Sequence, residues 1–480
     1  MSKSFLAVKN LESKINTMLS GRLGEEVASF YLNRFNIPRK VTLQYLKQRI
    51  ASNYSVKLSR FEGALSLPFL IVSVIRYVGL LLLIFMFSEK KNTKRQKFSL
   101  LIDDIQHQNE MDRWQQLEAE FGAQKTVYIA KSTNIESANS TIIYHKVLKG
   151  YDRELIVNNS LNFIGGDLAF LVWYSFKMKI NLVHLHSFFL NDYLYYHSLF
   201  KSFSAKYMIQ DRNLGRTNAL KNYLFKQSGG IASSCIQKNI VQHDGLALFY
   251  DVEIFFSYGD KTLDDILSLG GRIDHGCPVG SFAMEKSLLK LDKSNLKRSP
   301  DIDVFYIGIN AITSSRTDWS GYYKSIAWLA QLASDSGNLR IVIKHHPSWV
   351  FDEKEFEIIN GSGIEYLDKN VDSYECAYRS NFVITYGSSM GYELTGDGLN
   401  VTFLDPDDNN PFINQFVHID DNVVNSYDDL KLLILGSRSA KPNSKIIINS
   451  DYCYGASGVS RRIYEYLNSY ELKTATKDLT

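Results

Sequence analysis

Short apolar segments that alternate with longer helical segments constrain the fold of this chain more than any other feature. In the first half of the alternation, strands are predicted at 98–103, 127–130, 155–158, 181–186, 206–210, 239–243 and 253–258. A second series of strands is predicted at 304–309, 339–344, 363–367, 382–386 and 400–404. Helical segments separate them, at 160–178, 218–227, 319–334, 352–359 and 390–395. This alternation predicts an α/β fold with parallel, doubly wound sheets.

The chain is long enough for two such sheets. It has 480 residues, and a polar stretch at 286–301 separates the two series of strands. We therefore expect four regions, which are a helical N-terminal region at 1–97, a Rossmann-like domain at 98–285, a second Rossmann-like domain at 301–465 and a tail at 466–480. Two Rossmann-like domains that face one another imply a ligand cleft between them.

Residues 65–87 form the most apolar stretch of the chain. This stretch is long enough to span a bilayer, but Arg76 lies near its middle, where a charge costs at least ~2.5 kcal/mol on insertion scales. The basic segment 89–97 follows, and such segments bind anionic headgroups. A spanning helix, a helix on the membrane and a buried core helix all remain open. We favour contact with the inner membrane surface, from the cytoplasmic side, without a full crossing.

Composition narrows the compartment and the partners. The first 14 residues contain no apolar leader, and the four cysteines are scattered without a Cys-x-x-Cys pair. Free thiols in a reducing cytoplasm are therefore expected, and a metal site is not. The net charge of +3 gives no reason to expect a nucleic acid partner. Because GxGxxG, P-loop and HExxH motifs are absent, dehydrogenase, NTPase and zincin functions lack support, and we expect no cofactor.

The strand predicted at 339–344 runs directly into Lys344, His345, His346 and Pro347. Ligands of open α/β sheets bind beyond the carboxyl ends of the strands. An imidazole at this position can donate to a phosphate, Lys344 adds a positive charge, and Pro347 stiffens the loop. The alternative is a surface turn with two incidental histidines. We expect His346 to be the functional ring and His345 to be a packing or supporting residue.

A second loop of the same domain follows the strand predicted at 382–386. Gly387, Ser388 and Ser389 open a helix that carries Glu393. Backbone N–H groups at a helix N-terminus attract anions, and glycine lets a ligand approach the backbone closely. Glu393 is placed to accept hydrogen bonds from a ribose or a base, although a serine N-cap with a solvent-facing glutamate is the alternative. Two loops suited to phosphate favour a nucleotide ligand.

A third candidate lies in the first domain. The strand predicted at 239–243 ends in His243 and Asp244, and Gly245 then permits a sharp turn. An aspartate at the end of a strand can remove a proton from an acceptor hydroxyl. The alternative is an Asp-Gly turn beside a histidine that has no role in chemistry.

Weaker candidates for an acceptor side come from two other predicted strands. His184 and His186 alternate along 181–186, so both rings face one side of that strand and fit a core or a cleft. Gln210 ends the strand at 206–210, and Arg212 follows it. Arg212 fits a structural ion pair equally well.

Together these motifs resemble GT-B glycosyltransferases of bacterial surface and capsular polysaccharide biosynthesis. The nearest groups are bacterial sialyltransferases and polysialyltransferases, Kdo transferases and CDP-glycerol glycerophosphotransferases. His346-Pro347 matches their HP motif, Ser388-Ser389 their Ser-Ser motif and Asp244-Gly245 their acidic motif. His243 stands where the sialyltransferase pattern has a second acid. The resemblance covers roughly residues 230–460.

The resemblance implies an inverting, metal-independent GT-B enzyme. Its C-terminal domain would hold a CMP- or CDP-linked donor, and Asp244, or alternatively His243, would be the general base. The acceptor would be a polysaccharide or a lipid-linked molecule. Two alternatives remain, a UDP-sugar-dependent GT-B or 2-epimerase-like enzyme and a non-catalytic, membrane-associated scaffold of polysaccharide assembly.

Overall fold

The structure is a computed structural model. It describes residues 3–53, 67–86, 95–137, 140–144, 166–210, 218–238, 248–291, 300–309, 317–349, 352–408, 410, 422–439 and 453–477. The strands predicted at 155–158 and 239–243 lie outside these residues. The chain forms two compact units, which we call the N-terminal unit (3–256, 263–277 and 460–480) and the C-terminal unit (257–262 and 278–459).

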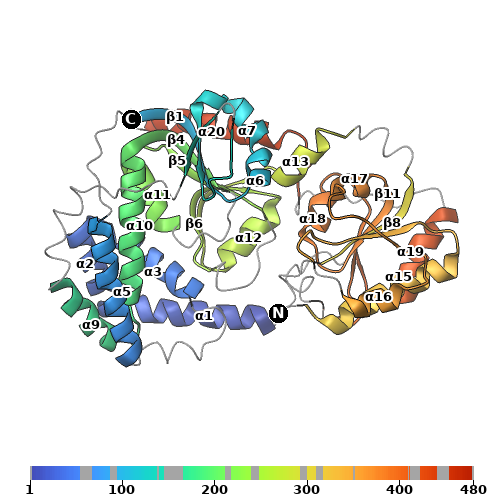
Figure 1. The fold of residues 1–480 in the computed structure, drawn as a ribbon, viewed down its shortest axis with the longest axis horizontal. Coiled ribbons are helices and arrows are strands. Elements are labelled where there is room, and N and C mark those ends of the chain that lie inside the picture. The colour runs from blue at the N-terminus through green and yellow to red at the C-terminus, as the bar shows by residue number, and fades with distance from the viewer. Residues whose placement is uncertain are drawn as a thin grey trace. The chain divides into compact units, whose positions relative to one another are not determined.

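The N-terminal unit contains a seven-stranded sheet with the order β3-β2-β1-β4-β5-β6-β7 (Figure 1). Its strands are β1 (Gln96–Ile105), β2 (Thr126–Ala130), β3 (Thr141–Tyr144), β4 (Phe203–Gln210), β5 (Ala232–Ile236), β6 (Asp251–Ser257) and β7 (Arg272–Pro278). The pairs from β3 through β6 are parallel. The middle of β1 is fully buried, as expected for a central strand that is covered on both faces.

Helices from widely separated parts of the sequence complete this unit, some against the sheet and others against further helices. They are α1 (Lys3–Leu19), α2 (Arg22–Phe35), α3 (Arg39–Asn53), α5 (Leu67–Met86), α6 (Gln108–Arg113), α7 (Gln115–Phe121), η1 (Ala123–Lys125), α9 (Gly166–Met178), α10 (Leu182–Ser202), α11 (Asn218–Gln227) and α12 (Asp260–Ser268), the last of which lies partly in the C-terminal unit. Side chains of α1, α2 and α3 share one hydrophobic core with β1, β4 and β6. The N-terminal helices are therefore an integral layer of this unit.

The C-terminal unit contains a six-stranded sheet with the order β10-β9-β8-β11-β12-β13, and all its pairs are parallel. Its strands are β8 (Ile302–Ile307), β9 (Ile341–Lys344), β10 (Glu365–Tyr366), β11 (Ser380–Thr385), β12 (Val401–Leu404) and β13 (Val423–Val424). Its helices are α13 (Phe282–Leu288), α15 (Trp319–Ser336), α16 (Glu353–Ile359), α17 (Ser373–Tyr378), α18 (Ser389–Thr395) and α19 (Tyr427–Ser439). The two parallel-sheet domains confirm the expected α/β fold class.

Local capping explains where the longest helix of the C-terminal unit begins and ends. The side chain of Asp318 accepts hydrogen bonds from the backbone N–H groups of Ser320 and Gly321, at 3.2 and 3.3 Å. Gly337 follows the helix with a φ of 58°, a left-handed conformation that favours glycine. The sequence prediction of a helix at 319–334 is confirmed by α15, which continues for two further residues.

The last helix, α20 (Val459–Lys477), belongs almost entirely to the N-terminal unit. Tyr207 donates to the Glu471 carboxylate at 2.7 Å, and Tyr470 donates to Glu253 at 2.8 Å. The sequence instead predicts that the second domain continues to residue 465 and that 466–480 is a tail. Partners that lie more than 200 positions away along the chain leave no local signal for this packing.

One predicted strand is wrong. Residues 182–202 form α10, and 181–186 is its start. Asn181 is the N-cap, because its side-chain oxygen accepts from the backbone N–H of His184 at 3.0 Å. The apolar residues Leu182, Leu185 and Phe189 recur at helical spacing and are buried. Over the six residues 181–186, the alternation of apolar residues with histidines predicts a strand. Over a longer stretch, apolar residues recur every three to four positions, which identifies the helix.

The apolar segment 65–87 contains α5. One flank of α5 packs along α10, with Leu70, Ser73 and Tyr77 buried at intervals of three and four residues. Over the part of the chain that the structure describes, no helix is long and apolar enough to cross a membrane.

Candidate functional site

The ends of three neighbouring strands lie at one level in the C-terminal unit. Ile307 at the end of β8 pairs with Lys344 of β9 on one side and with Thr385 of β11 on the other. Neighbouring strands are about 4.8 Å apart, so the Lys344 and Thr385 backbones are separated by roughly 10 Å. The two loops that the sequence selected, 344–347 and 387–389, therefore leave the same edge of one sheet, as predicted for this domain.

Lys344 is a buried cation without a carboxylate partner among the described residues. Its side chain is only 4% exposed overall, and Nζ makes a single long hydrogen bond, 3.5 Å, to the carbonyl of His345. Burial lowers the pKa of Lys344, and the nearby Cys376, Asp372 and Asp368 oppose that shift only in part. A desolvated ammonium with so little compensation is stabilised by any anion that reaches it.

His345 points to the opposite face of the sheet and is held in the core. Its Nε2 lies 2.7 Å from Oε1 of Glu355, and its ring stacks on Trp349 with a centroid distance of 4.1 Å. The fully buried Glu355 also accepts from the hydroxyls of Tyr322 and Tyr366, at 2.7 and 2.8 Å. The structure confirms the packing position expected of His345.

His346 is exposed at the carboxyl end of the strand. Its Nδ1 accepts from the backbone N–H of Ser348 at 3.2 Å and lies 2.7 Å from the Ser348 hydroxyl. The neutral ring therefore carries its proton on Nε2, which has no hydrogen bond within the described residues. Partial desolvation and then the Lys344 charge lower the pKa of His346. Pro347 is exposed beside it. A neutral N–H donor and a cation thus lie on one short segment.

The turn at 387–389 is organised by Thr385, a residue that the sequence reasoning missed. The Thr385 hydroxyl accepts from the backbone N–H groups of Gly387 and Ser388, at 3.3 and 3.0 Å, and donates to the Ile307 carbonyl. The Ser388 side chain then caps α18 by accepting from the Met390 N–H at 3.3 Å. Two of the backbone donors expected to be free for an anion are therefore already used.

Glu393 does not lie at the surface. It is 4% exposed, and Oε2 accepts from the hydroxyls of Ser281 and, at 2.7 Å, Tyr374. Ser281 is also the N-cap of α13. The carboxylate thus connects α18 to α13 and α17, and the solvent-facing alternative is excluded.

The candidate bases and the acceptor-side candidates are only partly described. Asp244, His243 and Arg212 lie outside the described residues. Gln210 ends β4 as expected, but it is buried and accepts from the Lys221 ammonium at 2.6 Å.

Two residues of this cluster escaped the sequence reasoning. Lys221 is 3% exposed and also binds the Asp103 carboxylate at 2.8 Å. A buried lysine inside a helix can be recognised from sequence only when its carboxylate partner is known.

His186 lies in the core of the helical layer. It is fully buried on α10, its Nδ1 is 3.2 Å from the Tyr31 hydroxyl, and its ring contacts Tyr77 and Phe189. Burial lowers the pKa of His186 to about 3. The predicted acceptor-side position depends on a strand at 181–186, whereas His186 lies on a helix and occupies the core position that was the other expectation.

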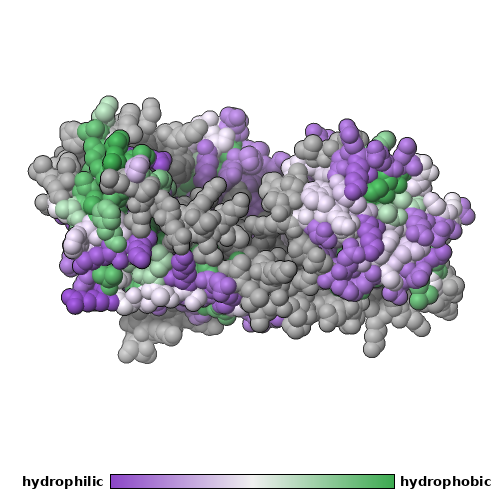
Figure 2. Space-filling view, turned by 90° about the horizontal axis from the view of Figure 1, so that it is seen from below, coloured by the Kyte–Doolittle hydropathy of each residue, from purple (hydrophilic) through white to green (hydrophobic). Residues whose placement is uncertain are grey.

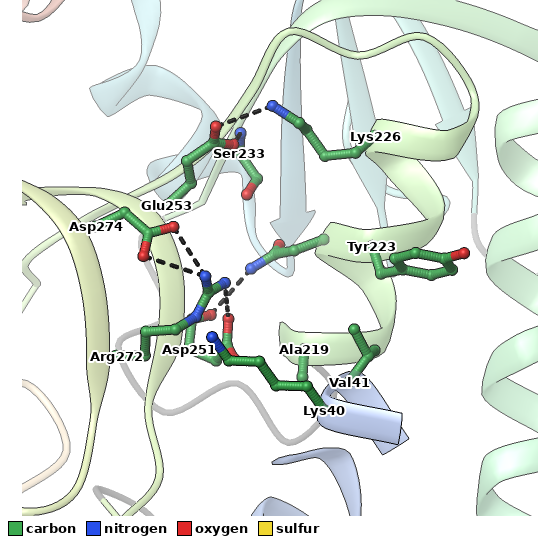
Figure 3. Close-up of a pocket in the computed structure, with 11 residues that line it drawn as sticks. Lys40, Val41, Ala219, Tyr223, Lys226, Ser233, Asp251, Glu253, Arg272 and Asp274 are labelled. Carbon is green, nitrogen blue, oxygen red and sulfur yellow. Dashed lines mark hydrogen bonds and ion pairs between the residues drawn. The ribbon is translucent and has the colours of Figure 1, made fainter. Parts of the chain in front are cut away.

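A cavity of about 220 Å³ lies in the N-terminal unit, at the beginnings of β5, β6 and β7 (Figure 3). Arg272 bridges Asp251 and Asp274 at 2.7 and 2.9 Å, and Lys226 binds Glu253 at 2.9 Å. Every carboxylate on its wall is therefore paired with a cation. The cavity also lies at the amino ends of the strands, whereas ligands of such sheets bind at the carboxyl ends.

The described part of the chain holds no cluster of three or more histidine, cysteine, aspartate or glutamate side chains that is arranged to bind a metal ion.

Comparisons with known proteins return only structural neighbours. No family model and no curated protein matches the chain. The UDP-GlcNAc 2-epimerase of Neisseria meningitidis, solved with UDP-GlcNAc, is 11% identical over 77% of this chain and 100% of that chain, with a TM-score of 0.49. A putative UDP-N-acetylglucosamine 2-epimerase from Listeria monocytogenes is 12% identical over 79% and 98%, with a TM-score of 0.48. The wall teichoic acid polymerase TagF is 10% identical over 86% and 99%, with a TM-score of 0.46. At these values an activity does not transfer to this chain.

Proposed function

We propose that the protein is a glycosyltransferase that moves a sugar, or a polyol phosphate, from a nucleotide-activated donor to a surface-polysaccharide or lipid-linked acceptor. A cytidine nucleotide is the favoured donor, and the reaction inverts the configuration of the transferred sugar without a metal. The proposal rests on the motifs at the carboxyl ends of the strands and on their resemblance to surface-polysaccharide transferases.

One observation carries the donor site, and it is the buried ammonium of Lys344. Its burial and its single 3.5 Å hydrogen bond leave a positive charge that the described residues do not neutralise. A donor phosphate supplies a matching negative charge. Binding then relieves a desolvation penalty in the free protein, which is a source of affinity that a fully paired lysine lacks.

The other proposed donor residues either follow Lys344 in the chain or belong to the loop that leaves the same edge of the sheet after Thr385. His346 donates from Nε2 to a phosphate oxygen, and Pro347 limits the freedom of the loop. The hydroxyls of Ser388 and Ser389 supply further donors, and Gly387 keeps that turn free of a side chain. Glu393 of α18 is the last predicted donor-side residue. Its Oε2 atom already accepts from Ser281 and Tyr374.

In the proposed step, an acceptor hydroxyl attacks the anomeric carbon of the donor. Asp244 takes the hydroxyl proton, with His243 as the alternative base, while the bond from the anomeric carbon to the phosphate oxygen breaks. The departing nucleotide keeps the electron pair, and Lys344 and His346 stabilise its growing charge. Arg212 remains a predicted acceptor-side residue.

Two other functions are distinguished by what they bind. A UDP-sugar transferase or a 2-epimerase-like enzyme binds UDP in preference to CMP or CDP. A non-catalytic scaffold of polysaccharide assembly binds none of these nucleotides. The cavity in the N-terminal unit, whose carboxylates are all paired with cations, supports neither of these two alternative functions.

Thermal unfolding in the presence of CMP, CDP, UDP and GDP tests the proposal. A nucleotide at 100 times its Kd stabilises the native state by about 2.7 kcal/mol, which raises the melting temperature by on the order of 5 °C. We expect this rise for CMP or CDP, and we expect it to vanish in Lys344→Met but not in Lys431→Met, which removes an exposed ion pair of the same unit. If only UDP raises the melting temperature, the donor is a uridine nucleotide and not a cytidine nucleotide. If no nucleotide raises it, the proposed transferase activity is wrong.

A further inference from the structure

Large hydrophobic side chains are concentrated on one exposed face of the N-terminal unit. Among the described residues, sixteen large hydrophobic side chains are exposed, and nine of them lie on α5 and α9. They are Phe69, Ile71, Val72, Ile75, Val78, Leu82 and Met86 of α5 and Trp173 and Phe176 of α9. We call these nine residues the apolar face. Scattered single hydrophobic residues are normal on a protein surface, whereas a concentration of this kind marks an interaction site.

The geometry of α5 explains why these residues remain exposed. Ser73 accepts from Asn181 at the start of α10, and the Tyr77 ring meets the ring of His186 on α10. Leu70 is buried on the same flank of α5. Ile75 and Leu82 lie on the other side of the same helix and are 65% and 60% exposed. Because the helix is apolar on both sides, packing on α10 satisfies only one of them.

The apolar face continues from α5 to α9. Both α5 and α9 pack on α10, and the Asn181 amide at the start of α10 donates to the Ser73 hydroxyl of α5 at 3.0 Å. Figure 2 shows hydrophobic residues gathered on the left of the view, the side on which Figure 1 places α5 and α9. Trp173 is the largest side chain of the face and is 59% exposed.

Positive charge borders this face. The helix α5 contains no acidic residue, and Arg76 is exposed on it. On α9 the Lys177 ammonium lies over the Trp173 ring, 4.9 Å from its centroid. In the sequence, the stretches 54–66 and 87–94 that flank α5 contain five basic residues and two glutamates. An apolar surface that carries Arg76, Lys177 and Trp173 matches the interface of an anionic membrane.

We propose that the apolar face is a docking surface for an anionic lipid bilayer. The helices α5 and α9 lie in the plane of the membrane, because α10 covers the inner flank of α5 along its length. The exposed side chains enter the boundary between headgroups and acyl chains, and the cations contact lipid phosphates. This inference stands on the N-terminal unit alone and does not depend on the identity of a nucleotide donor.

Co-sedimentation with lipid vesicles tests the proposal on the full-length protein. We expect binding to vesicles of phosphatidylglycerol and phosphatidylcholine, and weaker binding to phosphatidylcholine alone. The double variant Ile75→Asp/Leu82→Asp should weaken binding by on the order of a hundredfold. The matched control is Leu289→Asp/Leu432→Asp, because these leucines of the C-terminal unit are 60% and 71% exposed and lie outside the apolar face.

Two further measurements separate lipid from other occupants. Arg76→Gln should weaken binding to anionic vesicles by about fivefold and leave binding to neutral vesicles unchanged. The fluorescence of Trp173, taken as the difference between the wild type and Trp173→Phe, should shift to shorter wavelength on vesicles.

Sedimentation equilibrium tests the competing possibility that the apolar face binds a second copy of the chain. The proposal is overturned if the wild type ignores vesicles and instead forms a dimer that Ile75→Asp/Leu82→Asp dissociates. Vesicle binding that this variant leaves intact overturns it as well.

Discussion

The Nε2 atom of His345 lies 2.7 Å from the Oε1 atom of Glu355, in a pair that is almost completely buried. This contact joins the end of β9 to α16, and the His345 ring also stacks on the Trp349 ring. One residue further along the chain, His346 leaves this anchor and reaches the surface. The position of the proposed functional ring thus depends on a buried neighbouring histidine that is held by Glu355 and Trp349.

Replacing Glu355 by glutamine should destabilise the C-terminal unit. The carboxylate accepts hydrogen bonds from the two tyrosine hydroxyls and contacts the His345 ring, whereas an amide presents two donors of its own to the same groups. We expect a loss of about 1–3 kcal/mol in urea unfolding. Glu357→Gln on the exposed face of the same helix is the control, and an equal loss in both variants would argue against the buried network.

Gly308 leaves room for this ring, and alanine should not fit. A Cβ atom at that position would lie 2.0 Å from Nδ1 of His345, well inside van der Waals contact. Gly308→Ala is expected to reduce stability by about 1–3 kcal/mol. Gly436→Ala, whose new methyl group meets only ordinary contacts in α19, should be neutral or stabilising. Thermal unfolding of the two variants compares them, and tolerance of the first would show that the loop repacks.

The Lys344→Met substitution should have opposite effects on stability and on binding. Removing a buried charge that has no carboxylate partner among the described residues should raise the melting temperature of the nucleotide-free protein. The same change should abolish stabilisation by nucleotide. A variant that loses stability without nucleotide would show that Lys344 is compensated in the native state.

His346 and Asp244 should be needed for turnover and not for folding. His346→Gln and Asp244→Asn are expected to lower transfer by about 10²–10⁴-fold, the range typical of lost acid–base or charge stabilisation. Release of nucleotide and product formation measure the effect, and circular dichroism checks the fold. Only His346→Gln should also weaken nucleotide binding. Retention of wild-type turnover in both variants would remove them from the mechanism.

His186 should contribute to acid destabilisation. The pKa of the buried ring is about 3, below the ordinary value near 6.5, so the unfolded chain binds a proton that the native state does not. Stability is unaffected above the ordinary value and falls as the pH decreases below it. By pH 5 the loss is about 2 kcal/mol. Urea unfolding at pH 8 and pH 5 should show a smaller difference in His186→Phe than in the exposed control His107→Gln.

The sequence by itself determined most strands of the C-terminal sheet, whereas the edge strand β13 and the helices α13, α17 and α19 were not predicted. Buried parallel strands read as short, continuous apolar runs, and β8, β9, β11 and β12 were predicted within two residues at each end. The helix predicted at 218–227 coincides with α11. By contrast, β5 consists of Ala232-Ser-Ser-Cys-Ile236 and was missed, because its small and polar residues give a weak strand signal.

Only the tertiary structure decided what the side chains at the site do. The sequence placed Lys344, His345 and His346 at a strand end, but the fold buries the first two on opposite faces and exposes the third. The fold also buries Glu393. In the turn at 387–389, the backbone N–H groups of Gly387 and Ser388 donate to the Thr385 hydroxyl. Local periodicity records which residues are apolar. The partners of a buried polar group come from distant segments, so their identity is fixed only when the chain has folded.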